Sequence, residues 1–272
     1  MSVSLQLMME NAFAWHTRNP EEFWDVKDIS KFELPPIFQL QGKIPDKIVI
    51  CGTGPSLRTR RIKIAKKRRP YSNLIVANQS ATIALAKNKV SPHIIMITDP
   101  QTAAWEKLTE EEYNHCADVL MVPTIVHPSI VDKLRYPNKY VFISPFMGSP
   151  SESDPNGINF NSFNFFLDLI RPTLEGEAID SHIVQAWCYA NMAILAMGDI
   201  IVSKLANLEH NVGIHLSGID FWPATNEKEE QQFEIYQKDL KRIVNVLLTY
   251  KIRVTKEPSK SPLREFIEEV QL

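Results

Sequence analysis

Lys47-Ile-Val-Ile-Cys-Gly-Thr-Gly-Pro-Ser-Leu57 is the stretch that decides the fold. The run Ile48–Cys51 is continuously apolar, which is typical of a strand buried on both faces of a parallel sheet. Open parallel sheets bind ligands where such strands end, and glycines there let the backbone approach a phosphate. The sequence therefore predicts a nucleotide- and phosphate-binding loop made of Gly52, Thr53, Gly54, Pro55 and Ser56.

Apolar runs continue to alternate with helix-period segments on the carboxyl side of this loop. Strands are predicted at 74–77, 93–98, 119–122, 139–143, 213–220 and 253–255, and helices at 80–87, 103–115, 129–134, 181–208, 227–250 and from Pro262 onward. This alternation predicts right-handed βαβ crossovers. We expect an α/β fold: a doubly wound, mainly parallel Rossmann-like sheet with helices on both faces.

The 272 residues suffice for one large domain with appendages. Residues 1–45 are predicted to form an N-terminal helical arm, and residues 46–272 a Rossmann-like nucleotide-binding domain. The alternation of strand and helix patterns stops at about 145–180, where prolines and glycines accumulate. Long excursions of this kind in compact domains are commonly binding loops, so we expect a lid-like insertion there.

Composition excludes several classes of partner. The 30 basic and 32 acidic side chains give a net charge of -2, which is no global electrostatic reason to bind nucleic acid or an anionic membrane, and we expect no nucleic acid partner. The most apolar later stretch, 186–202, contains Asn191 and Asp199 and is shorter than the about 20 residues of a membrane span, so none is expected. Three separated cysteines without a CxxC pair predict reduced thiols in a cytoplasmic protein. Oligomerisation stays open.

The glycine loop does not match the common nucleotide fingerprints. A dinucleotide fold requires a third glycine where Leu57 stands, and an acidic residue where Asn78 ends the second strand. The GxxxxGK[ST] pattern of P-loop triphosphatases is absent from the sequence. An ordinary NAD enzyme is therefore disfavoured, and a P-loop enzyme is excluded.

Gly-Thr-Gly-Pro-Ser-Leu instead resembles the opening signature of two related groups of Rossmann-like proteins. One is the MptE-like family, with the motility-associated Maf glycosyltransferases and the 6-hydroxymethylpterin pyrophosphokinases. The other is the bacterial sialyltransferases that use CMP-sialic acid. Three further stretches look like motifs of these groups: Val76-Ala-Asn-Gln79, Val90-Ser-Pro-His-Ile94 with Asp99-Pro100, and Leu216-Ser-Gly-Ile-Asp-Phe221.

The resemblance implies a glycosyltransferase that moves a sugar from a nucleotide donor, a CMP-nonulosonic acid, to a glycan or protein acceptor. It implies nucleotide contacts at Asn78, Ser217 and Gly218, a catalytic role for Asp220, and binding of a divalent ion, Mg²⁺, at Asp99. Thr53 stands where the sialyltransferases have a donor-contacting asparagine. Two alternatives stay open: a pterin pyrophosphokinase using ATP and Mg²⁺, and a nucleotide-binding accessory protein without catalysis.

The general base of the related sialyltransferases is a histidine downstream of the Leu216–Phe221 motif, and here no histidine follows Asp220. His127 and His182 both flank loop or helix-start positions where a general base could sit, and we predict His182 as the base because the lid-like excursion before it should close over the cleft.

Plainer interpretations remain for several of these residues. Asn78 can cap a helix, although Ser80 is the favoured cap, and Asp99 can cap the helix expected after it. The basic run Arg58–Arg69 can be a solvated loop or can steer anions to the phosphate loop. His93 and His215, flanked by aliphatic residues, are expected in the core.

Overall fold

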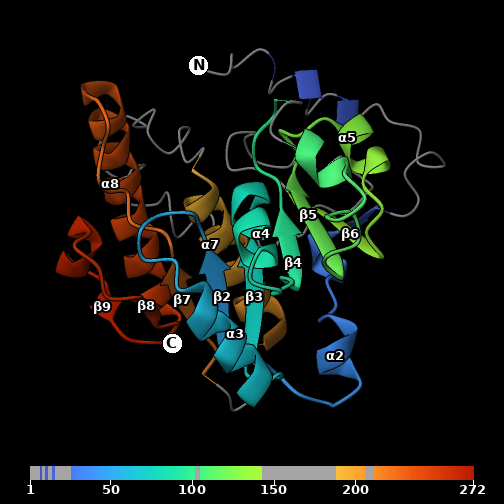
Figure 1. Cartoon of the computed structure of the whole chain (residues 1–272), viewed down its shortest axis with the longest axis horizontal. Coiled ribbons are helices and arrows are strands. Elements are labelled where there is room, and N and C mark those ends of the chain that lie inside the picture. The colour runs from blue at the N-terminus through green and yellow to red at the C-terminus, as the bar shows by residue number, and fades with distance from the viewer. Residues whose placement is uncertain are drawn as a thin grey trace.

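The computed structural model describes residues 7, 10, 11, 14, 15, 26–101, 105–142, 188–205 and 211–272. Within them, nine strands form one sheet in the order β1-β6-β5-β4-β3-β2-β7-β8-β9, and every neighbouring pair is parallel. Helices lie on both sides of this sheet (Figure 1). The predicted doubly wound α/β fold is confirmed.

The strands are β1 Val26–Asp28, β2 Lys47–Cys51, β3 Asn73–Ala77, β4 Ile94–Met96, β5 Val119–Pro123, β6 Asn138–Phe142, β7 Gly213–Ser217, β8 Val254–Lys256 and β9 Glu268–Glu269. The α-helices are α2 Pro36–Gln39, α3 Thr59–Arg68, α4 Gln79–Ala86, α5 Pro128–Lys133, α7 Tyr189–Ile200 and α8 Glu227–Thr249. The 3-10 helices are η1 Ile29–Lys31, η3 Glu106–Thr109 and η7 Pro262–Glu265, and η6 Ile201–Leu205 is a π-helix.

The strand order reverses direction at β2. From β2 the chain adds β3, β4, β5 and β6 on one side, and then returns to add β7, β8 and β9 on the other. The topological switch point therefore lies between the carboxyl ends of β2 and β7. In open α/β sheets, this is where ligands bind.

Alternate residues of the central strands face two different packing layers. Ile48 and Ile50 belong to the larger core cluster, which includes residues of α7 and α8. Val49 and Cys51 belong to a smaller cluster beneath α3 and α4. Because both faces of β2 are covered, its apolar run is continuous, as the sequence analysis assumed.

The basic run forms a helix rather than a loop. In α3, Ile62 is fully buried against the smaller cluster, while most of the charged residues of the helix are exposed. Three basic residues occupy its last turn, where they stabilise the negative end of the helix dipole. One apolar contact with the sheet and this favourable charge placement explain a helix in so polar a stretch.

Two predicted helices differ from the structure. In place of a helix at 103–115, the described part has η3 followed by turns, in which His115 adopts a φ of 79° and Asn114 accepts a hydrogen bond from the Arg135 N–H. The segment after Pro262 forms η7 and then β9, because the open edge of β8 supplies backbone partners for a short strand.

The N-terminal arm contributes to the sheet as well as to the surface. Asn11 and Trp15 donate side-chain hydrogen bonds to the carbonyls of Ile125 and Val126, beyond the end of β5. β1 then pairs with β6, a strand the sequence analysis did not predict. The proposed division at residue 45 stays a prediction, and the lid at 145–180 lies outside the described residues. In the part of the chain that the structure describes, no helix combines the length and apolar character of a membrane span.

Candidate functional site

Two loops are joined across the switch point by backbone hydrogen bonds. The N–H of Gly52 donates to the Ser217 carbonyl at 2.8 Å, and the N–H of Gly54 donates to the Gly218 carbonyl at 2.7 Å. In return, the N–H of Gly218 donates to Oγ of Ser56 at 3.0 Å. The structure thus brings together two motifs that the sequence separates by more than 150 residues.

The close approach of the loops requires glycines. A Cβ atom at Gly52 would lie 2.4 Å from the Gly218 carbonyl oxygen, and one at Gly54 would lie 2.6 Å from the Asp220 carboxylate. Gly218 itself has a φ of +74°, and a Cβ there would lie 2.4 Å from the Gly52 oxygen. These contacts give the glycines a packing role whether or not a ligand is bound.

Asp220 fixes the two loops relative to each other through hydrogen bonds. Its side chain is almost fully buried, with Oδ2 accepting a hydrogen bond from the Ser56 N–H at 2.8 Å and Oδ1 accepting one from the Ser259 hydroxyl at 2.8 Å. The Ser261 hydroxyl also donates to the Asp220 carbonyl. The described contacts of Asp220 are therefore structural, and its catalytic role stays a prediction.

A buried lysine extends this polar network toward the C-terminus. The ammonium of Lys256, only 1% exposed, donates to Ser259 Oγ at 3.1 Å and to Glu269 Oε1 at 2.7 Å. The hydrogen bond from Lys256 lowers the pKa of Glu269, which keeps that carboxyl ionised. The path Glu269–Lys256–Ser259–Asp220 therefore links strand β9 to the glycine loop. Neither Lys256 nor Ser259 belongs to a motif that could be recognised in the sequence.

The glycine loop uses most of its own amide donors. The N–H groups of Gly52, Gly54 and Ser56 all donate within the protein. The N-terminus of α3, immediately after the loop, has amides in its first turn that lack helical partners by geometry. The Arg58 guanidinium lies at the same place and donates to the Pro55 carbonyl at 2.7 Å. An anion at the switch point would therefore meet α3 and Arg58 rather than a free glycine cradle.

A second buried carboxylate, Glu257, lies beside this helix. Its side chain is fully buried, with Arg61 Nη1 at 2.9 Å, the Leu272 N–H at 3.2 Å and His215 Nε2 at 3.7 Å. Burial works to raise the pKa of Glu257, but these three neighbours outweigh it and the net shift is downward. The ionised carboxylate thereby ties α3 and the C-terminal residue to the sheet.

Several predicted residues lie nearby with simpler local contacts. Asn78 is the N-cap of α4, where its Oδ1 accepts from the Ala81 N–H at 2.8 Å; the expectation that Ser80 would be the cap is wrong. Asp99 is exposed and accepts from the Gln101 N–H at 2.9 Å. Thr53 and Pro55 are exposed, whereas Ser217 is buried and accepts from the Arg58 N–H at 3.4 Å. Their ligand contacts stay predictions, and His182 lies outside the described residues.

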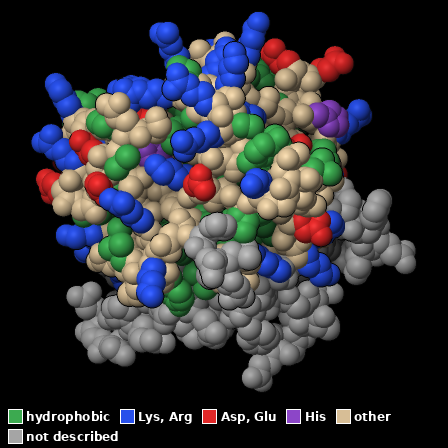
Figure 2. All heavy atoms as spheres, turned by 90° about the horizontal axis from the view of Figure 1, so that it is seen from below, with side chains coloured by type: hydrophobic (Ala, Val, Ile, Leu, Met, Phe, Trp, Pro, Cys, Tyr) green, Lys and Arg blue, Asp and Glu red, His purple; other side chains and the backbone are tan. Residues whose placement is uncertain are grey.

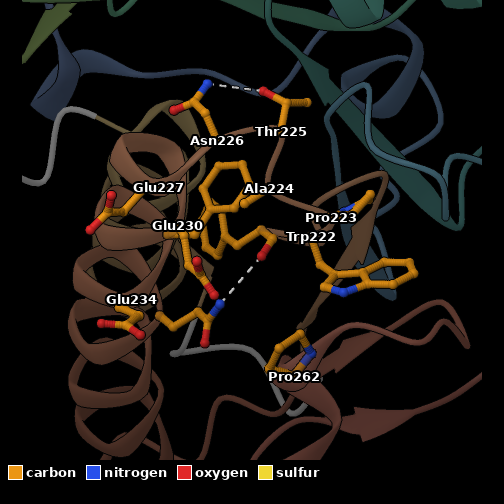
Figure 3. A pocket seen from close by; sticks show the side chains of 12 residues that line it. Trp222, Pro223, Ala224, Thr225, Asn226, Glu227, Glu230, Glu234 and Pro262 are labelled. Atoms are coloured by element: carbon orange, nitrogen blue, oxygen red, sulfur yellow. Dashed lines mark hydrogen bonds between the residues drawn. The ribbon is translucent and has the colours of Figure 1, made fainter.

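A cavity of about 550 Å³ opens directly after Asp220. It lies between the loop that follows β7, the first turns of α8, and Pro262 of η7 (Figure 3). Its size is in the range of small-molecule pockets, about 300–1,000 Å³. The lining residues are Phe221, Trp222, Pro223, Ala224, Thr225, Asn226, Glu227, Glu230, Phe233, Glu234, Gln237 and Pro262.

The cavity combines aromatic surface with carboxylates. Phe221 packs 6.0 Å from Phe233, centroid to centroid, and its carbonyl accepts from Gln237 Nε2 at 3.3 Å. Figure 3 shows the Glu230 carboxylate on the side of α8 that faces the loop, whereas Glu227 and Glu234 extend away from Trp222 and Pro262. Sequence reasoning missed this cavity, because its walls come from three separate segments.

The described residues do not fit a protein-bound Mg²⁺ site. Among them there is no group of three His, Cys, Asp or Glu side chains placed to share an ion. Asp99 stands exposed with one local hydrogen bond, and both Asp220 oxygens already accept hydrogen bonds. No chemical step is therefore assigned to a metal at Asp99.

The sheet order and the paired loops at the switch point define a Rossmann-like α/β protein, and a cavity of about 550 Å³ opens at the carboxyl edge. The chain belongs to the MptE-like family, whose description is 6-hydroxymethylpterin diphosphokinase MptE-like; the match covers residues 25–166, over half of the sequence. This confirms the resemblance inferred from the glycine motif. No curated protein matches the sequence significantly.

Three solved structures are similar to this chain at low identity. A point mutant of the α-2,3/8-sialyltransferase CstII is 16% identical with a TM-score of 0.41, over 82% of this chain and 86% of that one. The Maf glycosyltransferase from Magnetospirillum magneticum AMB-1 is 15% identical with a TM-score of 0.44, over 79% of this chain and 32% of that one. CstII from Campylobacter jejuni, in complex with the substrate analogue CMP-3FNeuAc, is 17% identical with a TM-score of 0.32, over 82% and 84%. Similarity at this level is not evidence of a shared activity.

Proposed function

We propose that the protein is a glycosyltransferase that uses a nucleotide-activated sugar, a CMP-nonulosonic acid, and transfers it to a glycan or protein acceptor. The observation that carries the proposal is the cavity at the carboxyl end of β7, next to the two motif-bearing loops of the switch point. The sequence motifs at Gly52–Leu57 and Leu216–Phe221, which resemble those of CMP-sugar enzymes, support the choice of donor.

In this proposal the donor phosphate lies at the N-terminus of α3. Helix N-termini favour anions, and Arg58 adds a positive charge at the same place. Thr53 is exposed at the loop tip and can donate its hydroxyl to the same phosphate. Asp220 and the glycines hold the loop in position, and the acceptor enters the cavity that begins at Phe221.

The reaction needs a group to take the acceptor's proton. An acceptor hydroxyl oxygen attacks the anomeric carbon of the sugar and forms the new C–O bond. The bond from that carbon to the phosphate oxygen breaks, and CMP leaves with the electron pair. We assign the proton to the carboxylate of Glu230, which lies in the cavity (Figure 3). Within the proposal, Glu230 takes the place of the histidine that the related enzymes use.

A nucleotide panel tests the donor class first. CMP, CDP, UDP, ADP and ATP, each with and without Mg²⁺, are compared for their effect on the melting temperature. A ligand at 100 times its Kd stabilises the native state by about 2.7 kcal/mol. For a chain of this size that is a rise of about 5–11 °C. We expect CMP to give this rise without Mg²⁺, and no shift with any cytidine nucleotide would contradict the proposal.

Substitution of the carboxylate tests the chemistry separately. Glu230→Gln should lower the rate of sugar transfer by about 10²–10⁴-fold, while CMP still raises the melting temperature. Glu227→Gln is the matched control, because Glu227 lines the same cavity but extends away from it. Equal rates for Glu230→Gln and the parent protein would rule out Glu230 as the base. CMP binding without any transfer would favour the accessory-protein alternative.

The pterin diphosphokinase reaction is the second candidate, favoured by the description of the matching family. The aromatic lining of the cavity, Phe221, Trp222 and Phe233, offers faces on which a pterin ring can stack. This candidate predicts stabilisation by ATP only with Mg²⁺, and formation of AMP together with a pterin diphosphate.

A further inference from the structure

The opposite end of the sheet, where the central strands begin, collects basic side chains. The Lys47 N–H donates to the Ser72 carbonyl, and the Gly213 N–H donates to that of Asp46. The Ile214 N–H donates to the Arg253 carbonyl, and Lys66 Nζ donates to that of Ser91. Five segments, distant in sequence, therefore meet at this end: 40–47, 66–73, 87–91, 211–213 and 248–253. We call this surface the basic face.

Basic residues far outnumber acidic ones on the basic face, although two acidic residues outside the five segments interact with it: Glu268 forms an ion pair with Arg253, and the charge of Asp118 acts on Lys66. In these five segments the only acidic residue is Asp46, although the whole chain has a net charge of -2. The basic residues are Lys43, Lys47, Lys66, Lys67, Arg68, Arg69, Lys87, Lys89, Lys251 and Arg253. Most are exposed. Figure 2 looks at this end of the molecule and shows Lys and Arg side chains spread across it.

Part of this placement follows from helix geometry. α3, α4 and α8 follow strands and run back toward the strand starts, so their C-terminal ends lie at the basic face (Figure 1). Cations there stabilise the negative helix ends. Helix dipoles do not explain why apolar residues are exposed at the same end.

Exposed aliphatic side chains lie among these charges. Leu40, which follows α2, is 83% exposed, and Leu248, in the last turn of α8, is 54% exposed. Ile64 on α3, which precedes the segment 66–73 by two residues, is 41% exposed. They are three of the four large hydrophobic residues that are exposed in the described part of the chain; the fourth, Trp222, lines the cavity. Cationic residues together with exposed leucines offer the two contacts that a lipid bilayer can use, since the charges can meet headgroups and the leucines can meet acyl chains.

We propose that the basic face docks the protein on an anionic phospholipid surface. We infer a phospholipid surface because its negative charge complements the basic residues and its acyl chains can contact the exposed leucines. A single-stranded nucleic acid would match the charge, but it would use stacked aromatic rings, and in these segments the described aromatic residues, Tyr71 and Tyr250, are both half-buried. Docking in this orientation directs the carboxyl edge, with its cavity, toward water. The inference does not depend on the proposed function.

Vesicle co-sedimentation of the full chain tests the docking. Vesicles of phosphatidylcholine alone are compared with a two-to-one mixture of phosphatidylcholine and phosphatidylglycerol, at about 0.15 M and about 1 M salt. The Debye length falls from about 8 Å to about 3 Å between these conditions. We expect binding to the mixed vesicles only, and loss of binding at high salt. Equal binding to both kinds of vesicle, or none to either, would overturn the proposal.

Two variants locate the contact. The triple variant Arg68→Glu, Lys87→Glu, Lys89→Glu should reduce binding at least about 100-fold, since each basic residue near an anionic surface contributes about five-fold. Its matched control reverses three exposed lysines outside the basic face, Lys107, Lys228 and Lys238, with the same change of net charge. Loss of binding in both triples alike would show a net-charge effect and contradict the assigned face.

Leu40→Ser separates a lipid from a nucleic acid. This variant should weaken vesicle binding about ten-fold, because the leucine loses its contact with acyl chains. A fluorescent single-stranded oligonucleotide is the competing probe. The lipid proposal would be contradicted if the protein bound the oligonucleotide more tightly than the mixed vesicles and if Leu40→Ser changed neither affinity. That result would indicate a nucleic acid partner instead. Melting curves of each variant confirm that it is folded.

Discussion

The two ends of the sheet differ in packing: one is closely packed and the other exposes its side chains to solvent. At the carboxyl edge, two loops approach so closely that Gly52, Gly54 and Gly218 have no room for a side chain, and the buried groups of Asp220 and Lys256 are linked through Ser259. At the amino edge, long cationic side chains extend into solvent, and leucines are exposed. Substitutions should therefore have large effects on folding at the first edge and small ones at the second.

The largest effect is expected at the loop contact. Gly218→Ala should lower the free energy of unfolding by about 4 kcal/mol, because it combines a left-handed backbone with a clash. Gly42→Ala is the matched control: Gly42 also has a positive φ, +57°, but its Cβ would contact nothing within 4 Å, so we expect a loss of about 1 kcal/mol. Urea unfolding measures both. Equal losses would mean that the loop approach adds nothing to the cost of the backbone conformation.

The next effect concerns the carboxylate that joins the loops. Asp220→Asn places an amide where two donors converge, and should lower stability by about 2–3 kcal/mol. Asp99→Asn, at an exposed carboxyl of the same edge, should change it by less than about 0.5 kcal/mol. Thermal unfolding of both variants makes the comparison. An Asp220→Asn variant with the same melting temperature as the parent protein would contradict the structural role assigned to this residue.

A smaller effect depends on pH. The pKa of Glu257 is lowered in the folded protein, so its contribution to stability is present above the unfolded pKa, near 4.5, and is lost as the pH falls through the folded value. Glu257→Gln should cost about 1.5 kcal/mol at pH 7 and progressively less below about pH 4.5. The test compares the denaturant midpoints of Glu257→Gln and the parent protein between pH 7 and a pH below 4.5. A difference between the two proteins that is independent of pH would show that ionisation of Glu257 is not the cause.

The smallest effect is expected on the basic face. Lys87→Ala and Arg68→Ala should each change the free energy of unfolding by less than about 0.5 kcal/mol, because both side chains are exposed. Urea unfolding of both variants measures these changes. Losses comparable to that of Asp220→Asn would remove the contrast between the two edges.

Strand prediction was accurate where the apolar runs are continuous, because burial on both faces leaves an unbroken signal from β2 to β7. Prediction failed where tertiary partners decide. α3 is too charged to be recognised locally, and β9 forms because β8 has a free edge. The sequence placed Gly52–Ser56 and Gly218–Asp220 at strand ends beside one cleft, and the structure joins these two loops; their ligand contacts stay predictions. Lys256, Ser259 and the cavity were missed, since they approach the site only through the chain's return after β7.

The sequence by itself determined the class of fold, the family and the placement of the motif residues at strand ends, because these depend on periodicity and on short local patterns. Only the tertiary structure decided what those residues touch. It uses the glycine amides and the Asp220 carboxylate to join two loops, and it gathers ten basic residues from separate segments at one end. The reason is that side-chain contacts across a sheet are set by strand order, which no local stretch of sequence contains.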